Sequence, residues 1–277
     1  MPQLIEIEKL GERLYRLVDV ASKFYFPVQS FLVIGDKKAA LIDTGLGIGN
    51  IRDAVGEVTS LPVSVLHTHG HLDHIGGDPL FELNYISPLE HVPNLAEAVE
   101  QFEMRKRMAG SFPSSVPISD LTFVEPAEVS YLPVLDRDLF DLGGITLEVI
   151  AIPGHTEGSI AYVDTDGEFA FTGDGIADIH WFDDTNKSSS VEEFNETLLR
   201  FKDRSRNPER IYASHVQSHF GSDMILDLIA AAQRILCGSD DPIVNSDYLF
   251  LKHGPLHGSR AGHARIFYRP ESIWRKG

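Results

Sequence analysis

Histidine and aspartate side chains are concentrated in one short stretch, LHTHGHLDHIGG, at residues 66–77. Within it, His69, His71, Asp73 and His74 fall in six consecutive positions, and two glycines follow. An extended turn that leads into a helix can present such residues as two sets of ligands facing a pair of ions. Imidazole nitrogens and carboxylate oxygens are ligands for zinc, iron or manganese. We favour a metal site over a polar turn, because so many ligands in so few positions are rare in turns.

Three further candidate ligands lie downstream, each at the end of a predicted strand. His155 follows Pro-Gly in IPGHTEGS, Asp174 ends FTGD, and His215 ends RIYASH. Each is weak evidence alone, since polar residues are common in turns. Their joint occurrence after the first cluster strengthens the prediction of a metal site. The single cysteine, Cys237, excludes a cysteine-type structural zinc site.

Short apolar runs bounded by Gly and Asp predict the strands that must position these residues. The predicted strands are 13–20, 30–35, 38–43, 61–68, 145–152, 159–165, 168–174 and 210–215. Helices are predicted where apolar residues recur at helical spacing, at 49–58, 94–109, 190–203 and 223–236. Asn94 with Glu97, and Ser190 with Glu193, have the spacing of helix-capping pairs, and Gly110 is expected to follow the end of the second helix. Strands and helices therefore come in two similar rounds.

Together these motifs resemble the metallo-β-lactamase superfamily of binuclear metallohydrolases. Five segments occur in the order of that family: LIDTG, THGHLDHIGG, PGHTEGS, FTGD and a late histidine. The resemblance covers the chain from Asp43 to His215. It implies an α/β fold, a four-layer αββα sandwich of two mixed β-sheets flanked by helices. The late segment reads YASHVQSHF where the family usually has Pro-Gly-His-Gly, so His219 is a rival to His215.

The resemblance also implies two divalent metal ions, expected to be zinc, with iron or manganese as alternatives. Asp174 would bridge the ions, and Asp43 would orient a ligand by hydrogen bonding. A plain turn cap is an equally weighted interpretation of Asp43. The implied ligands are His69, His71 and His155 for the first ion, and Asp73, His74 and His215 for the second.

The implied reaction is hydrolysis of a small ester, thioester or lactone by a metal-bridging hydroxide. Asp73 would accept the proton or pass it to the leaving group. The β-lactamases of the family lack the bridging aspartate, so Asp174 favours relatives of the hydroxyacylglutathione hydrolases and lactonases. The alternatives are a mononuclear iron persulfide dioxygenase, a phosphodiesterase of the same fold, and a non-enzymatic protein with a closed metal site.

We expect a single domain over residues 1–277, with a helical insertion at about 88–130 and a basic C-terminal extension at 239–277. In the family, the insertion lies over the metal pocket. The alternative interpretation of the insertion is that its apolar residues form the core face of helix 94–109. The alternative interpretation of the basic extension is a solvent-exposed edge strand. The expected substrate-pocket residues are Phe102, Met104, Met108, His180 and Trp181.

Composition limits the partners. The chain has 277 residues, with 41 acidic and 24 basic side chains, for a net charge of −17. This charge repels nucleic acids and anionic membranes, so we expect a small-molecule substrate. No apolar run reaches the length of a membrane span or a signal peptide. With one cysteine, we expect a cytoplasmic protein, either a monomer or a homodimer.

Overall fold

The computed structural model describes residues 3–22, 27–111, 116–182, 188–240 and 257–275. The chain divides into two compact units. The first consists of Met1–Glu148 and Ser214–Gln217, and the second of Val149–Ala213 and Ser218–Gly277. The short return segment is tied to the first unit by Gln29, whose side-chain amide donates to the carbonyl of Val216 at 2.6 Å. His215 therefore belongs to the first unit.

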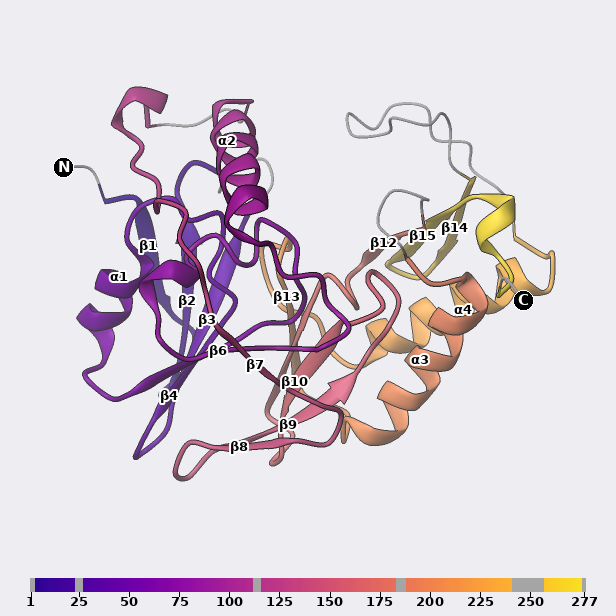
Figure 1. Ribbon diagram of the computed structural model, residues 1–277. Coiled ribbons are helices and arrows are strands. Elements are labelled where there is room, and N and C mark those ends of the chain that lie inside the picture. The colour runs from indigo at the N-terminus through magenta and orange to yellow at the C-terminus, as the bar shows by residue number, and fades with distance from the viewer. Residues whose placement is uncertain (1–2, 23–26, 112–115, 183–187, 241–256, 276–277) are drawn as a thin grey trace. The chain divides into compact units, whose positions relative to one another are not determined.

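A seven-stranded mixed sheet forms the first unit (Figure 1), in the order β1-β2-β3-β4-β5-β6-β7. The pairs from β1 to β4 are antiparallel, and those from β4 to β7 are parallel. The strands are β1 Ile5–Lys9, β2 Leu14–Asp19, β3 Gln29–Ile34, β4 Ala39–Ile42, β5 Val63–Leu66, β6 Asn84–Ile86 and β7 Tyr131–Pro133. Because β4 and β5 are parallel neighbours, the loops after them leave the same edge of the sheet.

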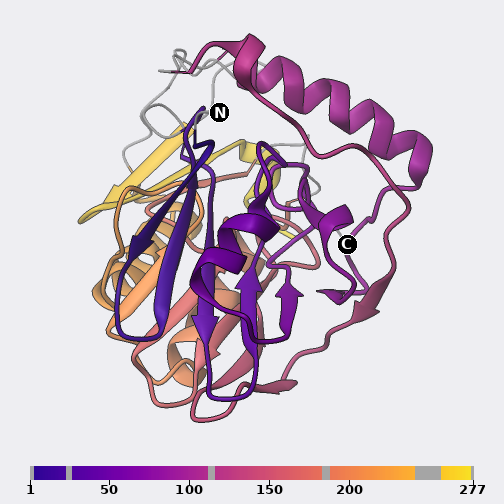
Figure 2. The ribbon, with the colours of Figure 1, turned by 90° about the vertical axis from the view of Figure 1, so that its left-hand side faces the viewer.

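Helix α1 (Ile51–Val58) covers part of this sheet (Figure 2). Asn50 caps its start, since the side-chain oxygen accepts from the backbone N–H of Asp53 at 3.2 Å. Its buried face forms an apolar core with the strands. That core includes Ile51, Ala54, Val55, Leu32, Leu41 and Val65.

Helix α2 (Leu95–Ser111) begins at the predicted Asn94 (Figure 2). The Asn94 side chain accepts from the backbone N–H of Glu97 at 3.1 Å, and Glu97 accepts from that of Asn94 at 2.9 Å. The expectation that Gly110 lies beyond the helix was wrong. The helix includes Gly110 and continues to Ser111, because one glycine lowers helix propensity by only about 1 kcal/mol.

The second sheet is also mixed, in the order β13-β11-β10-β9-β8. Its strands are β8 Leu139–Asp141, β9 Thr146–Ala151, β10 Ile160–Asp164, β11 Phe169–Gly173 and β13 Arg210–Ala213. Strand β11 pairs antiparallel with β10 and parallel with β13. In the second unit, helices α3 (Val191–Arg204) and α4 (Asp223–Leu236) bury apolar faces against these strands, and Figure 1 shows the helices side by side. The predicted capping box of Ser190 and Glu193 is present.

A three-stranded sheet of order β12-β15-β14 completes the second unit. Its strands are β12 Ile179–Trp181, β14 His257–Ala261 and β15 Ala264–Tyr268. The short helices η1 Asp78–Leu80, η2 Ile118–Asp120 and η3 Pro270–Ser272 lie in connecting segments. Two mixed sheets with helices packed on them confirm the predicted α/β class. Within the described ranges, every helix is too short or too polar to span a lipid bilayer.

Candidate metal centre

Asp43 organises the loop that carries the histidine cluster. It follows β4 in a left-handed backbone conformation, with φ of 59°, which is uncommon for a residue other than glycine. The backbone N–H of Thr68 donates to Asp43 Oδ1 at 2.8 Å, and the Thr68 hydroxyl donates to Oδ2 at 2.7 Å. These two bonds connect the end of β4 to the loop after β5 and help to orient the carboxylate.

The same carboxylate contacts His74, a predicted ligand. Asp43 Oδ2 lies 2.9 Å from His74 Nδ1, and both side chains are buried. Burial opposes ionisation of Asp43, but attraction to the His74 and His67 imidazoles holds the pKa of this carboxyl below its usual value. A carboxylate accepts from Nδ1–H, which assigns the tautomer of His74 whose Nε2 carries a lone pair.

The two loops pack too closely for side chains at two glycines. A Cβ at Gly47 would lie 2.3 Å from the carbonyl oxygen of Gly76, and a Cβ at Gly76 would lie 2.4 Å from the carbonyl carbon of Leu46. Backbone bonds then join the loops directly, from Thr44 N–H to His74 O and from Gly76 N–H to Gly45 O, both at 2.8 Å. The Gly-Gly that follows the histidine cluster is thus a packing requirement of the site.

Asp73, His74 and His215 converge within the first unit. Each offers one ligand atom, and these atoms lie within 4.8 Å of one another. His215 Nε2 is 3.4 Å and His74 Nε2 is 3.9 Å from Asp73 Oδ2. His215 Nδ1 lies 2.8 Å from the carbonyl oxygen of Pro27, which can only accept, so Nδ1 carries the hydrogen and Nε2 the lone pair. Both histidines therefore direct a lone pair toward one carboxylate.

His219, the rival of His215, has a different setting. It is exposed, and its ring centroid lies 5.6 Å from that of Tyr212 in the second unit. The geometry within the first unit thus supports His215 as the late ligand.

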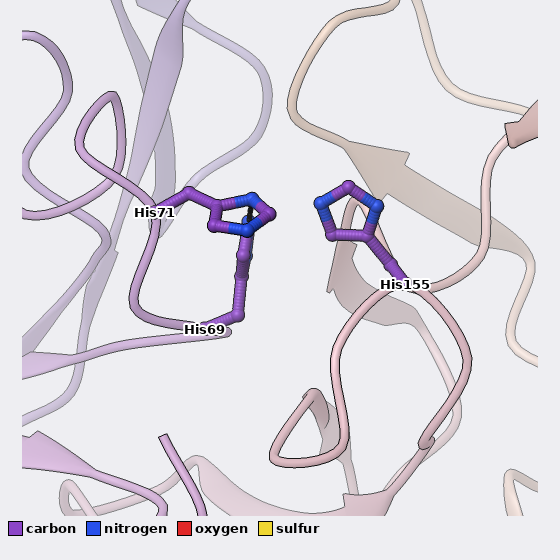
Figure 3. Close-up of side chains that lie close together, drawn as sticks. All are labelled: His69, His71 and His155. Carbon is purple, nitrogen blue, oxygen red and sulfur yellow. Dashed lines mark hydrogen bonds between the residues drawn. The ribbon is translucent and has the colours of Figure 1, made fainter. Parts of the chain in front are cut away.

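His69 and His71 form a second pair on the loop after β5 (Figure 3). His69 Nε2 lies 3.1 Å from His71 Nδ1, and His69 Nδ1 lies 3.2 Å from the hydroxyl of Thr68. Two imidazole nitrogens on one tetrahedral zinc ion are separated by about 3.3 Å, given Zn–N bonds of about 2.0–2.1 Å. The spacing of this pair is close to that of two ligands on one ion.

The second unit contains the remaining predicted ligands. His155, on the loop after β9 (Figure 3), has its Nε2 3.7 Å from Asp174 Oδ2 at the end of β11. The pairing of β11 with β13 shifts register between Phe171 and Gly173, just before Asp174. Such bulges redirect side chains and are frequent next to active sites. The predicted ligands thus form two sets, five residues in the first unit and two in the second.

The expected substrate-pocket residues differ in burial and in packing. On α2, Phe102 lies partly buried with its ring 6.3 Å from that of Phe123, and Met108 packs on a small apolar core of the first unit. Met104 on the same helix is 43% exposed. Packing of Phe102 and Met108 supports the core-face interpretation for these two. The side chain of Trp181 lies outside the described residues.

His180 is buried in the second unit rather than at a rim. Its ring stacks on Phe194 at a centroid distance of 3.9 Å. Burial, with a smaller effect of His155, lowers the pKa of His180 to about 3, so this imidazole is neutral at physiological pH. Its role as a substrate-pocket residue stays a prediction.

Sequence reasoning missed one group of polar side chains in the first unit, the buried His67, Asp78 and Arg105 and the partly buried Tyr131. Burial alone would lower the pKa of His67, but the carboxylates of Asp78 and Asp43 raise it to about 9. His67 lies inside the quoted histidine cluster, yet its spacing does not distinguish a ligand from a residue behind the ligands. Only the pairing with Asp78, eleven positions later, does so.

Comparison with known proteins assigns the family. Residues 25–215 match the model of the metallo-beta-lactamase superfamily, and the chain belongs to this superfamily. A metallo-beta-lactamase from Pontibacter korlensis has the same fold, with a TM-score of 0.57, 18% sequence identity, and coverage of 83% of this chain and 99% of that one. The resemblance inferred from the motifs, and the fold that it implied, are confirmed.

Two curated relatives illustrate the range of similarity. An uncharacterized protein of Mycobacterium tuberculosis is 31% identical over 145 residues, which are 50% of this chain and 62% of that protein. The acyl-coenzyme A thioesterase MBLAC2 of Homo sapiens is 28% identical over 219 residues, covering 72% of this chain and 76% of the thioesterase. The chain therefore spans less than two thirds of the mycobacterial relative.

The donor set of the first unit fits the divalent metal that the family implies. Two imidazoles and one carboxylate are typical zinc ligands, and each imidazole has its Nδ1–H directed to an oxygen acceptor. This arrangement presents both Nε2 lone pairs and the carboxylate of Asp73 at one point. The residues present can thus hold a divalent ion.

Proposed function

We propose that the protein is a metal-dependent hydrolase that cleaves a small ester, thioester or lactone. The observation that carries this proposal is the convergence of Asp73, His74 and His215, with both imidazole tautomers set by oxygen acceptors. A thioester is the favoured substrate class, because a relative that aligns with 72% of this chain is named as an acyl-coenzyme A thioesterase.

In this proposal, the seven predicted ligands would hold two zinc ions. Asp73, His74 and His215 would hold one ion, His69, His71 and His155 would hold the other, and Asp174 would be a ligand shared by both. When bound, the ions would supply a hydroxide near neutral pH and polarise the scissile carbonyl. Asp43 keeps His74 in its coordinating tautomer. Asp73, whose side chain is 14% exposed, would hand a proton to the leaving group.

The proposed setting follows from composition. The single cysteine fits a reducing compartment, so the protein is proposed to act in the cytoplasm. The net charge of −17 favours a small-molecule substrate over nucleic-acid or membrane partners.

The test is metal analysis of the purified protein, followed by a substrate panel. We expect about two zinc ions per chain, and hydrolysis of an acyl-coenzyme A thioester, a glutathione thioester or a lactone. Hydrolysis should disappear with a chelator and return with zinc. One iron per chain with oxygen consumption on a thiol persulfide would contradict the proposal, as would cleavage of a phosphodiester alone.

A further inference from the structure

His67 and Asp78 form a buried pair, and His67 also contacts Asp43 through the carboxylate oxygen that does not contact His74. His67 Nε2 is 3.1 Å from Asp78 Oδ2, and His67 Nδ1 is 3.6 Å from Asp43 Oδ1. His67 and Asp78 are completely buried, and Asp43 is almost so. His67 therefore bridges two carboxylates, of which one contacts the predicted ligand His74.

Both carboxylate oxygens of Asp78 accept hydrogen bonds from hydroxyl groups. The hydroxyl of Thr44 donates to its Oδ1 at 2.5 Å, and the hydroxyl of Tyr131, on β7, donates to its Oδ2 at 2.8 Å. A buried carboxylate is costly unless it is paired and hydrogen-bonded. These contacts satisfy that requirement and fix the oxygen that faces His67.

Helix α2 joins this group through Arg105. Arg105 is buried, and it lines one small pocket together with Asp78 and Tyr131. The pocket has a volume of about 20 Å³, and its lining combines polar side chains with apolar residues that include Ile75, Pro79 and Val129. A volume of this size with several polar partners can hold one water molecule. The negative charges of Asp43 and Asp78 are thus offset by the positive charges of His67 and Arg105.

We propose that His67, Asp78, Arg105 and Tyr131, the buried charge network, position Asp43 and through it the metal ligand His74. The network acts as a set of positioning residues that links α2 to the metal centre. The inference rests on the proposed function, since it assumes that His74 binds a metal ion. Removing one member would let the Asp43 carboxylate reorient and weaken its hold on His74.

The first test is Asp78→Asn, which keeps the side-chain shape but removes the charge. We expect the zinc affinity of the folded protein to fall about tenfold, the lower end of the effect of groups that orient metal ligands. Affinity is measured by competition with a chromophoric chelator, and the absorption of cobalt in place of zinc should also change. Val55→Ala, in the core of α1 and the same sheet, is the control for lost stability and should retain wild-type affinity.

The outcomes separate this inference from the proposed function. Wild-type zinc affinity in Asp78→Asn would overturn the network's positioning role while leaving the hydrolase proposal intact. If the wild-type protein binds no zinc, the proposed function itself is wrong, and the inference with it. If Asp78→Asn does not fold, Arg105→Met and Tyr131→Phe test the same network from α2 and β7. Unchanged zinc affinity in both would then overturn the inference.

Discussion

Asp43 and His74 are joined by a 2.9 Å hydrogen bond between two buried side chains, across the loops that follow two neighbouring parallel strands. The bond connects the strained backbone of Asp43 to a residue that directs its other nitrogen toward Asp73. Local strain of this kind is common at functional sites, where the surrounding contacts maintain it. The pair therefore joins the two loops of the candidate metal centre and orients His74 within it.

Replacing Asp43 should weaken metal binding without removing a ligand. Asparagine tolerates the left-handed conformation as aspartate does, so Asp43→Asn changes the charge and adds no backbone strain. We expect zinc affinity to fall about 10- to 100-fold, as measured by chelator competition. Asp53→Asn, at an exposed position on α1, is the control. Equal affinities for Asp43→Asn and the wild type would refute an orienting role for Asp43.

The two late histidines should differ in their effect on metal content. His215→Ala removes a side chain directed at Asp73, so we expect metal content per chain to fall to about half if two ions are bound. His219→Ala removes an exposed ring and should leave metal content unchanged. Elemental analysis of both variants, prepared in parallel, decides between them, and the opposite result would exchange the assignments.

Asp174→Ala should reduce occupancy of both metal positions, because a bridging ligand serves two ions. Asp178→Ala, four residues later and partly buried, is the matched control and should bind metal normally. Stepwise zinc titration followed by calorimetry measures both binding events. Two full-affinity events in Asp174→Ala would show that this carboxylate is not a bridge.

His180 should make the metal-free protein less stable as pH falls. In the folded state its pKa is about 3, whereas in the unfolded chain it titrates near pH 6.5, so below that value protons favour the unfolded state. The resulting loss is about 2 kcal/mol of unfolding free energy between pH 6.5 and 4.5. In His180→Phe, which retains a ring against Phe194, urea denaturation should show a smaller loss. Equal losses in both proteins would contradict burial of a neutral imidazole.

Much of the fold followed from local patterns in the sequence. Short apolar runs located β2, β3, β4, β5, β9, β10, β11 and β13, and helical spacing located all four α-helices of the described ranges. The capping pairs at Asn94 and Ser190 are present as predicted, because they depend only on residues three positions apart. Strands β1, β6, β7, β8 and β12 were not predicted, and β14 and β15 lie in the C-terminal extension, for which an edge strand was the alternative interpretation. Strands β6, β7, β8 and β12 have only three residues each, and their strand character depends on pairing with a neighbouring strand.

In the candidate site, too, residues close together in the sequence were predicted, and contacts between distant segments were not. The sequence located the loop of His69 to His74 because its four predicted ligands fall within six consecutive positions. It did not identify the partner of His67, since Asp78 and Tyr131 come from separate segments and have no distinctive spacing. It also gave Asp43 equal weight as a turn cap, whereas the structure shows a carboxylate that accepts hydrogen bonds from Thr68 and contacts His74.

The most direct test of the central claim is anomalous diffraction at the zinc edge from crystals grown with zinc. The account predicts a peak about 2.0–2.2 Å from the Asp73 carboxylate and from Nε2 of both His74 and His215. A map without a peak among these three side chains, at a zinc concentration that saturates the protein in solution, would contradict the account.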